Sequence, residues 1–194
     1  MKIHLIRHGT TPANEAGVYC GQTDVPLSQK GIAEILGFKE KGIYPQDAGI
    51  FFTSGYLRTK ETLAIIYGEV EAAIIPELAE YDFGDFSMKS HEQLKDLPEY
   101  NRWAADETWD IPCPRGESKN QFRKRVEAGY ARLLGETIKV GGGSAVAVCH
   151  AGTISAIMGI LMPDRYDFYN WMPRRGRGYT IIYKDGRFAD HTEI

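Results

Sequence analysis

Short apolar runs alternate with longer, partly apolar segments along the chain. The short runs lack helical spacing and predict buried strands over residues 3–6, 49–53, 72–75 and 144–149. Near the C-terminus, residues 179–183 and 188–191 flank Asp185-Gly186, a pair typical of tight hairpin turns. The pattern therefore predicts four buried strands followed by a terminal hairpin.

Helices are predicted between these strands. They run from about 29 to 41, from Ser54 to Tyr67, from Ser118 to about 138, and from about 153 to Met162. Ser54 is predicted to cap the second helix, and Ser118 with Gln121 gives the capping-box signal of the third. Residues 8–27 are rich in Gly, Thr, Pro and Asn, which predicts a loop.

Alternation of strands and helices predicts an α/β fold. We expect a three-layer α/β/α sandwich around a mainly parallel sheet, to which the hairpin adds one antiparallel edge strand. A single domain is expected over residues 1–194. Between about 81 and 115 polar and aromatic residues mix and prolines recur, which predicts a partly helical, lid-like insertion over the body.

Composition narrows the class of protein. The 194 residues carry 23 Lys+Arg against 26 Asp+Glu, a net charge of −3, which gives no reason to expect nucleic-acid binding. Apolar stretches are too short for a membrane span, and the N-terminal residues have a strand pattern that is unlike a signal peptide. Cys20, Cys113 and Cys149 are far apart and form no disulfide framework, so a cytoplasmic location is expected. A homodimer is left open.

Charged side chains follow the predicted strands. Binding and catalytic sites of parallel sheets lie at the carboxyl ends of the strands. Arg7 and His8 follow the first strand, Arg58 lies one turn into the helix after the second, and His150 follows the fourth. Glu77 and Glu80 come after the third strand. We therefore expect two arginines, two histidines and a carboxylate to converge from distant parts of the chain.

This set of side chains suits phosphoryl transfer. Guanidinium groups make forked bonds to a phosphate dianion, and a neutral imidazole is a competent nucleophile. A second imidazole, if protonated, adds positive charge, and a carboxylic acid can protonate the leaving oxygen. Backbone N–H groups that begin the helix after His150, such as that of Ala151, add dipoles for the anion.

Other phosphate chemistries lack their signatures in this sequence. There is no Gly-Lys dipeptide of a Walker A loop and no Asp-x-Asp of an aspartyl-phosphate enzyme. No cysteine is followed six residues later by arginine, and His and carboxylates are not grouped at metal-ligand spacings. Of the phosphate chemistries considered, phosphoryl transfer through histidine remains.

The sequence resembles the histidine phosphatase superfamily, in its phosphoglycerate-mutase-like branch. The resemblance rests on segments in one order along nearly the whole chain: Leu5-Ile6-Arg7-His8-Gly9-Thr10-Thr11 with Asn14, Gly21-Gln22-Thr23-Asp24-Val25-Pro26-Leu27-Ser28 with Gly31, Ser54-Gly55-Tyr56-Leu57-Arg58-Thr59-Lys60-Glu61-Thr62, Leu78-Ala79-Glu80 with Gly84, Gly116-Glu117-Ser118, and His150-Ala151-Gly152-Thr153.

The resemblance implies a role for each candidate. His8 would be phosphorylated during turnover, with its attacking nitrogen deprotonated near neutrality. The phosphoryl group would be held by Arg7, Arg58, His150, the loop residues Asn14 and Gln22, and Ala151. Glu80 would protonate the leaving group and then take a proton from water; Glu77, Asp82 and Asp85 compete for that role in the sequence. The resemblance implies no metal and no organic cofactor.

The predicted function is a metal-independent phosphomonoesterase that acts on a small phosphorylated metabolite through a phosphohistidine. The compact length and the motifs are similar to those of the α-ribazole-5′-phosphate phosphatase type of cobalamin synthesis. The alternatives are a phosphoglycerate mutase and an inactive phospho-ligand-binding protein. Many members have Glu after His-Gly, where this sequence has Thr10, followed by Thr11. The run from Gly84 to Met88 lacks the second Glu-Gly pair, so substrate choice is the open question.

The remaining histidines and one basic run lie outside this set of candidate residues. His4 and His191 are predicted to be structural, whereas His91 in the insertion is either exposed or faces the substrate. The basic run from Arg174 to Arg177 is either a solvated loop or a rim that fixes an anionic substrate.

Overall fold

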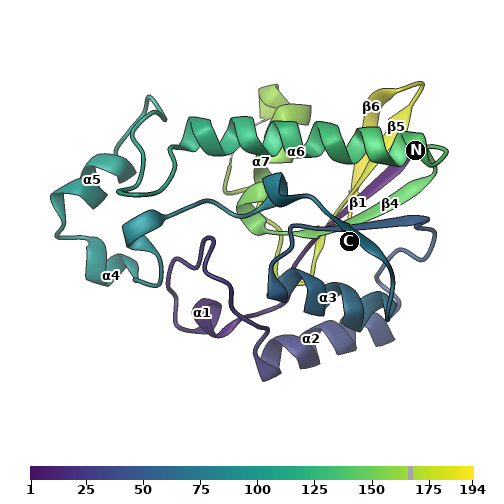
Figure 1. Ribbon diagram of the computed structural model, residues 1–194, viewed down its shortest axis with the longest axis horizontal. Helices are drawn as coiled ribbons and strands as arrows, with labels where there is room; N and C mark the ends of the chain where they lie inside the picture. The colour runs from purple at the N-terminus through teal and green to yellow at the C-terminus, as the bar shows by residue number, and fades with distance from the viewer. Residues whose placement is uncertain (166–167) are drawn as a thin grey trace.

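The computed structural model describes residues 1–165 and 168–194. Its centre is a six-stranded sheet with the strand order β3-β2-β4-β1-β5-β6 (Figure 1). The strands are β1 (Lys2–Arg7), β2 (Ile50–Thr53), β3 (Ala72–Ile74), β4 (Ser144–Cys149), β5 (Gly178–Lys184) and β6 (Arg187–Glu193). β1, β2, β3 and β4 pair in parallel, which confirms the mainly parallel sheet.

The helices are α1 (Pro12–Glu15), α2 (Gln29–Glu40), α3 (Leu57–Tyr67), α4 (His91–Leu94), α5 (Pro98–Ala104), α6 (Lys119–Lys139) and α7 (Ala151–Leu161), with 3-10 turns η1 (Pro76–Leu78), η2 (Gly84–Phe86) and η3 (Pro163–Arg165). They include the four that the sequence predicts (α2, α3, α6 and α7), with shifts of a few residues. Within the described ranges, the longest and most apolar helices fall short of what a membrane crossing requires.

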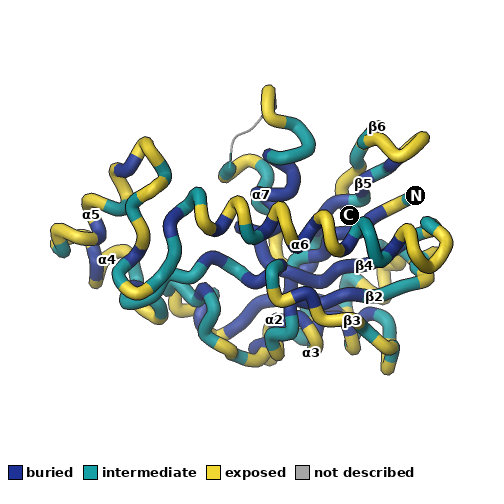
Figure 2. The backbone as a smooth tube through the Cα atoms, turned by 45° about the horizontal axis from the view of Figure 1, so that its top comes forward, coloured by how far each residue is buried: buried dark blue, intermediate teal, exposed yellow. Residues whose placement is uncertain are grey.

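Side chains alternate between two cores, one on each face of the sheet. Ala145 and Ala147 of β4 pack with Val126 of α6 and Ile157 of α7. Val146 and Val148 of the same strand pack with helices α2 and α3 on the opposite face. Figure 2 shows the central strands as a buried band. This alternation of period two produces the predicted three layers.

The C-terminal hairpin adds the antiparallel part of the sheet. β5 pairs antiparallel with both β1 and β6, so it alone runs against the other described strands. Asp185 and Gly186 both have positive φ, 50° and 73°, as a tight hairpin turn requires. The Asp-Gly pair therefore predicted the turn correctly.

Two local predictions were wrong. The loop over 8–27 contains the short helix α1, which Thr11 and Asn14 cap reciprocally. The helix predicted to begin at Ser54 begins at Leu57, because Gly55 turns the chain with a φ of 92° and Tyr56 takes the N-cap position. Ser54 is thereby left at the strand end, where its hydroxyl contacts His150.

Residues 81–115 contain η2, α4 and α5 and lie beyond one end of the sheet (Figure 1). An aromatic cluster holds them together: the ring of Trp103 lies 5.7–6.4 Å from those of Tyr19, Tyr81, Phe83, Phe86 and Tyr100. Tyr19 comes from the loop after α1, and a hydrogen bond between the Tyr19 and Tyr100 hydroxyls (2.7 Å) ties that loop to α5. These aromatics give the segment a fixed shape next to the strand ends.

The carboxyl ends of β1, β2 and β4 lie side by side, since these strands are parallel neighbours. Arg7 pairs with Cys149 and Thr53 with Val148, so the residues that follow each strand meet at one edge. α2 closes against the loop after β1 at Gly31, where a Cβ would lie 2.1 Å from the Thr10 carbonyl oxygen. The fold thus delivers His8, Ser54 and His150 to one crevice.

Candidate active site

His8 follows β1 and presents a defined tautomer to the crevice. Its backbone N–H donates to the Cys149 carbonyl (3.0 Å), and its ring Nδ1 lies 2.7 Å from the Gly9 carbonyl oxygen. Because a carbonyl oxygen only accepts, Nδ1 carries the ring proton. Nε2 therefore keeps its lone pair, which a nucleophile needs.

The surroundings of His8 keep the ring neutral. Burial is the largest effect: only 6% of the residue is exposed, and the pKa of His8 falls well below its ordinary value of 6.5. The positive charges of Arg58 and Arg7 lower the pKa further. Both effects disfavour the charged imidazolium, so His8 is unprotonated at neutral pH.

His150 lies beside His8, with 5.3 Å between the ring centroids. Its Nδ1 accepts from Arg58 Nη2 and Nε at 3.2 and 3.3 Å. Since a guanidinium only donates, Nδ1 is unprotonated and Nε2 donates to Ser54 Oγ at 2.7 Å. Burial, followed by the charge of Arg58, lowers the pKa of His150 well below 6.5. The imidazole is neutral here, and the arginines supply the positive charge.

Ser54 belongs to the site, although the sequence assigned it to a helix cap. Its Oγ accepts from His150 and lies 3.4 Å from Thr59 Oγ1, which donates to the Tyr56 carbonyl at 2.7 Å. This chain of donors ends on a backbone acceptor and fixes the His150 tautomer. The position of Ser54 directly after the second strand was the signal that could have placed it here.

Arg58 is the most enclosed charge of the site, with 1% of the residue exposed. Besides His150, it donates to the Gly21 carbonyl (2.7 Å) and the Thr23 carbonyl (2.8 Å). Its own carbonyl accepts from Thr62 Oγ1, which in turn accepts from the Gly9 N–H. Arg58 therefore joins α3, the 21–23 loop and the end of β4 around one cation.

Arg7 has a donor without an acceptor. Its Nη1 donates to the Pro173 carbonyl (2.8 Å), but its Nε is buried and has no hydrogen-bond partner among the described residues. Burial lowers the pKa of Arg7 to about 10, against the opposing effect of Glu80, so the group is charged at neutral pH. A buried, unsatisfied N–H is costly, and an anion's oxygen would satisfy it.

Glu80 reaches the same cavity from the segment after β3. Its two oxygens accept from the backbone N–H groups of Tyr81 and Gly152, each at 3.0 Å. A Cβ on Gly152 would lie 2.4 Å from Glu80 Oε1, so the approach requires glycine at the start of α7.

The competing carboxylates are engaged elsewhere. Glu77 pairs with Arg132, Asp82 accepts from the Gly84 N–H, and Asp85 pairs with Arg115. Of these four acidic residues, Glu80 is the one that lines the cavity. The geometry thus favours Glu80 as the acid.

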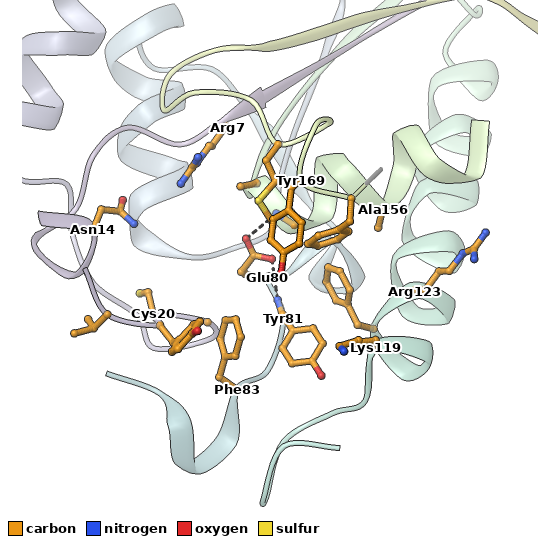
Figure 3. A pocket seen from close by; sticks show the side chains of 18 of the residues that line it. Arg7, Asn14, Cys20, Glu80, Tyr81, Phe83, Lys119, Arg123, Ala156 and Tyr169 are labelled. Carbon is orange, nitrogen blue, oxygen red and sulfur yellow. Dashed lines mark hydrogen bonds between the residues drawn. The ribbon is translucent and has the colours of Figure 1, made fainter. Parts of the chain in front are cut away.

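The remaining predicted contacts differ in how directly they reach the cavity. Asn14 caps α1 through Oδ1, and its amide nitrogen turns toward the cavity (Figure 3). Ala151 lines the cavity at the first turn of α7. Gln22 Nε2 donates to the Glu80 carbonyl at 3.2 Å, so the structure gives it a contact with the acid's backbone. Its contact with a phosphoryl group stays a prediction.

A cavity of about 640 Å³ is lined at this place by Arg7, His8, Asn14, Arg58, Glu80 and Ala151. Arg7 and Asn14 enter from one side and Tyr81 and Phe83 from the opposite side, with Glu80 between them (Figure 3). The side of the cavity around Tyr81 and Phe83 is aromatic, because the rings of Tyr19, Trp103 and Phe122 pack against them; Tyr169 also lines the cavity. The arrangement combines a compact cationic end with a broad, mainly aromatic chamber that Lys119 and Arg123 also line.

The other histidines lie outside this cavity. His4 bonds Thr180 and Ser144 on the sheet, and His191 lies against the rings of Trp171 and Tyr179. His91 bonds the Tyr100 hydroxyl within the insertion. Each therefore has a structural partner.

The basic run divides into two parts. Arg177 lies over the Phe38 ring, at 5.5 Å from its centroid, whereas Arg174 and Arg175 are exposed beside Arg7. The positive charge of Arg175 contributes to the lowered pKa of both Arg7 and His8. Within residues 1–165 and 168–194, no three His, Cys, Asp or Glu side chains are arranged to hold a metal ion.

Known proteins share this arrangement of elements. The family described as the histidine phosphatase superfamily (branch 1) matches residues 3–189. The chain belongs to the histidine phosphatase superfamily. The adenosylcobalamin/alpha-ribazole phosphatase of Salmonella typhimurium is 34% identical over 137 residues, which cover 69% of this chain and 67% of that protein.

Other similarities extend along more of the chain. The crystal structure of the alpha-ribazole phosphatase from Shigella flexneri has a TM-score of 0.81 at 27% identity and covers 97% of this chain and 93% of that one. A 2,3-bisphosphoglycerate-dependent phosphoglycerate mutase of Beijerinckia indica is 27% identical over 172 residues, which cover 81% of this chain and 79% of that protein. The predicted family, fold class and phosphatase class of this histidine phosphatase are confirmed.

The lowered pKa of His8 predicts a pH-dependent stability. The unfolded chain binds a proton at His8 below pH 6.5, whereas the folded protein does not, so the free energy of unfolding falls as pH decreases below 6.5. Each such histidine contributes a slope of at most about 1.4 kcal/mol per pH unit. Urea unfolding between pH 7 and 5 is expected to show a shallower decrease for His8→Gln than for the parent protein. Equal slopes would contradict a depressed pKa at His8.

The contact between Glu80 and α7 gives a second prediction. In Gly152→Ala the new methyl group displaces the Glu80 carboxylate, while alanine is well tolerated in a helix. We expect kcat/KM for an alkyl phosphate to fall about 100-fold, the scale of general-acid catalysis. Urea unfolding serves as the control and is expected to change by less than about 1 kcal/mol. Full activity in this variant would contradict the placement of Glu80 as the acid.

Proposed function

We propose that this histidine phosphatase hydrolyses a phosphomonoester whose alcohol carries a planar aromatic base, with α-ribazole 5′-phosphate as the substrate. The observation that carries the proposal is the aromatic chamber next to the cationic end of the cavity. A base can stack on such rings, whereas a phosphoglycerate has no apolar part to place there. The names of the Salmonella and Shigella relatives support the same substrate.

In the first step His8 Nε2 attacks the phosphorus atom. An N–P bond forms as the bond from phosphorus to the ester oxygen breaks, and Glu80 gives its proton to that oxygen so that a neutral alcohol leaves. The hydrogen bond from His8 Nδ1 to the Gly9 carbonyl supports the role of His8 as the nucleophile, because it stabilises the positive charge that develops on the ring.

In the second step water replaces His8. The Glu80 carboxylate takes a proton from water, the water oxygen bonds to phosphorus, and the N–P bond breaks. Inorganic phosphate leaves, His8 Nε2 recovers its lone pair, and Glu80 is protonated again for the next cycle. The reaction consumes one ester and one water and produces one alcohol and one phosphate.

The arginines hold the phosphoryl oxygens in both steps. The unsatisfied Arg7 Nε supports this role directly, Arg58 lines the same cavity, and the buried imidazole of His150 lies beside the His8 ring. Asn14 and Ala151 at the first turn of α7 complete the proposed phosphate contacts, and Gln22 approaches from the loop. Positive charge fixed before the reaction stabilises the transition state without reorganisation.

The segment 81–115 supplies the chamber and is proposed as the lid of a single domain. Metal independence is part of the proposal, since the roles above use only side chains of this chain. A cytoplasmic location is also proposed, and the three free cysteines are compatible with it.

The proposed function is tested with a panel of α-ribazole 5′-phosphate, ribose 5-phosphate and 3-phosphoglycerate, with and without EDTA. Free phosphate and isomerised phosphoglycerate are both measured. We expect the largest kcat/KM for α-ribazole 5′-phosphate, unchanged by EDTA. Isomer formation without phosphate release would support a mutase, and loss of activity in EDTA with recovery on adding a divalent ion would overturn metal independence.

The chamber gives a prediction of its own. Phe83→Ala removes one ring of the wall, and stacking of a base on an aromatic side chain contributes about 1–3 kcal/mol. We therefore expect kcat/KM for α-ribazole 5′-phosphate to fall about tenfold. Ribose 5-phosphate, which lacks the base, is the matched control and is expected to change less than about twofold. Equal losses on both substrates would contradict stacking in this chamber.

A further inference from the structure

The segment that carries Glu80 has little regular structure of its own. After the short turn η1 (Pro76–Leu78), the chain runs extended past Glu80 into the aromatic insertion. Its backbone carbonyls therefore need partners from elsewhere, and the position of the Glu80 carboxylate depends on those partners. Three of the four carbonyls from Glu77 to Glu80 accept from one guanidinium on α6.

Arg125 donates to three carbonyls of this segment. Its Nη1 donates hydrogen bonds to the carbonyls of Glu77 (2.9 Å) and Ala79 (3.0 Å), and its Nη2 donates to the carbonyl of Glu80 (3.1 Å). Thr153 Oγ1 adds a bond to the Ala79 carbonyl at 3.0 Å. One planar group thus fixes the backbone immediately before the acid.

Glu117 fixes the backbone immediately after the acid. Its Oε1 accepts from the Asp82 N–H (2.8 Å), its backbone N–H donates to the Asp82 carbonyl (3.1 Å), and its carbonyl accepts from the Tyr81 hydroxyl (2.6 Å). Both carboxylate oxygens of Glu117 also accept from Arg125: Oε1 from Nη2 at 2.6 Å and Oε2 from Nε at 3.2 Å. The two residues therefore bracket Glu80 as a bidentate ion pair.

Two further observations show that the pair is built for close contact. The side chains of Arg125 and Glu117 are only 23% and 14% exposed. One helical turn beyond Arg125, a Cβ on Gly129 would lie 2.8 Å from the Cβ of Glu77, so glycine lets α6 approach the segment. Such proximity gives the guanidinium its reach to all three carbonyls.

We infer that Arg125 and Glu117 form a positioning pair that holds Glu80 at the leaving oxygen, a role that rests on the proposed function of Glu80 as the proton donor. The pair acts through the backbone on both sides of Glu80 and donates nothing to the substrate. A displacement of about 1 Å can cost about 100-fold in rate when a reacting group loses its alignment. Lysine cannot replace arginine here, because a single ammonium lacks the planar fork that spans the carbonyls.

The test compares Arg125→Lys with the parent protein on p-nitrophenyl phosphate and benzyl phosphate. The first substrate has a good leaving group and needs little protonation, whereas the second releases an alcohol and needs the acid. Because kcat/KM reports the steps up to the first irreversible one, it isolates transfer to His8. We expect the loss on benzyl phosphate to exceed the loss on p-nitrophenyl phosphate at least about tenfold.

Arg132→Lys is the matched control. Arg132 lies on the same helix and bonds Glu77 through its side chain at 3.3 Å, without touching the backbone near Glu80. It is expected to change either rate less than about twofold. Equal losses on the two substrates in Arg125→Lys, or no loss, would overturn the inference.

Two further variants keep the outcomes separate. Urea unfolding shows whether Arg125→Lys is folded. If it is not, Glu117→Gln replaces it, and the same larger loss of kcat/KM on benzyl phosphate is expected. Glu80→Gln is measured in parallel. Selective loss in Glu80→Gln but not in the pair variants would overturn only the positioning role, whereas no selectivity in Glu80→Gln would overturn both the acid and the pair.

Discussion

The buried guanidinium of Arg58 is the constraint on which this site depends. All of its described hydrogen bonds go to neutral acceptors: two carbonyls of the 21–23 loop and the Nδ1 of His150. It lowers the pKa of both His8 and His150, and it fixes the loop against α3 and β4. A buried positive charge without a described carboxylate partner is unfavourable by itself, and the phosphate dianion of the proposed substrate would compensate it.

The cavity joins this charge to a second, chemically different region. The cationic end comes from residues that follow the parallel strands, so the core of the fold fixes it. The aromatic end comes from the 17–24 loop and the 81–115 segment, which contact each other through Tyr19, Tyr100 and Trp103, with Phe122 of α6 added. Glu80 lies where the two regions meet, between Gly152 of α7 and Tyr81 of the chamber. Chemistry and choice of substrate thus depend on separate parts of the chain.

Sequence reasoning located the cationic end because periodicity is a local signal. The apolar runs gave the strands, and residues that follow parallel strands meet at one edge, which placed Arg7, His8 and His150 together. Ser54 was misassigned because a serine before a helical pattern resembles a cap, and only the turn at Gly55 shows otherwise. Arg125 carries no local signal of its role, since its three carbonyl partners lie 45–48 residues earlier in the chain. The chamber depends on contacts between distant aromatics, which no local pattern encodes.

The central claim is that phosphorus bonds to His8 during turnover, and rapid quenching tests it most directly. The protein is mixed with an excess of phosphoryl-labelled substrate, quenched in base within the first turnover, digested and analysed by mass spectrometry. The account predicts an acid-labile phosphoryl group on His8, absent from a His8→Asn variant. A label on another residue, or a full turnover of product with no labelled protein at any time, would contradict it.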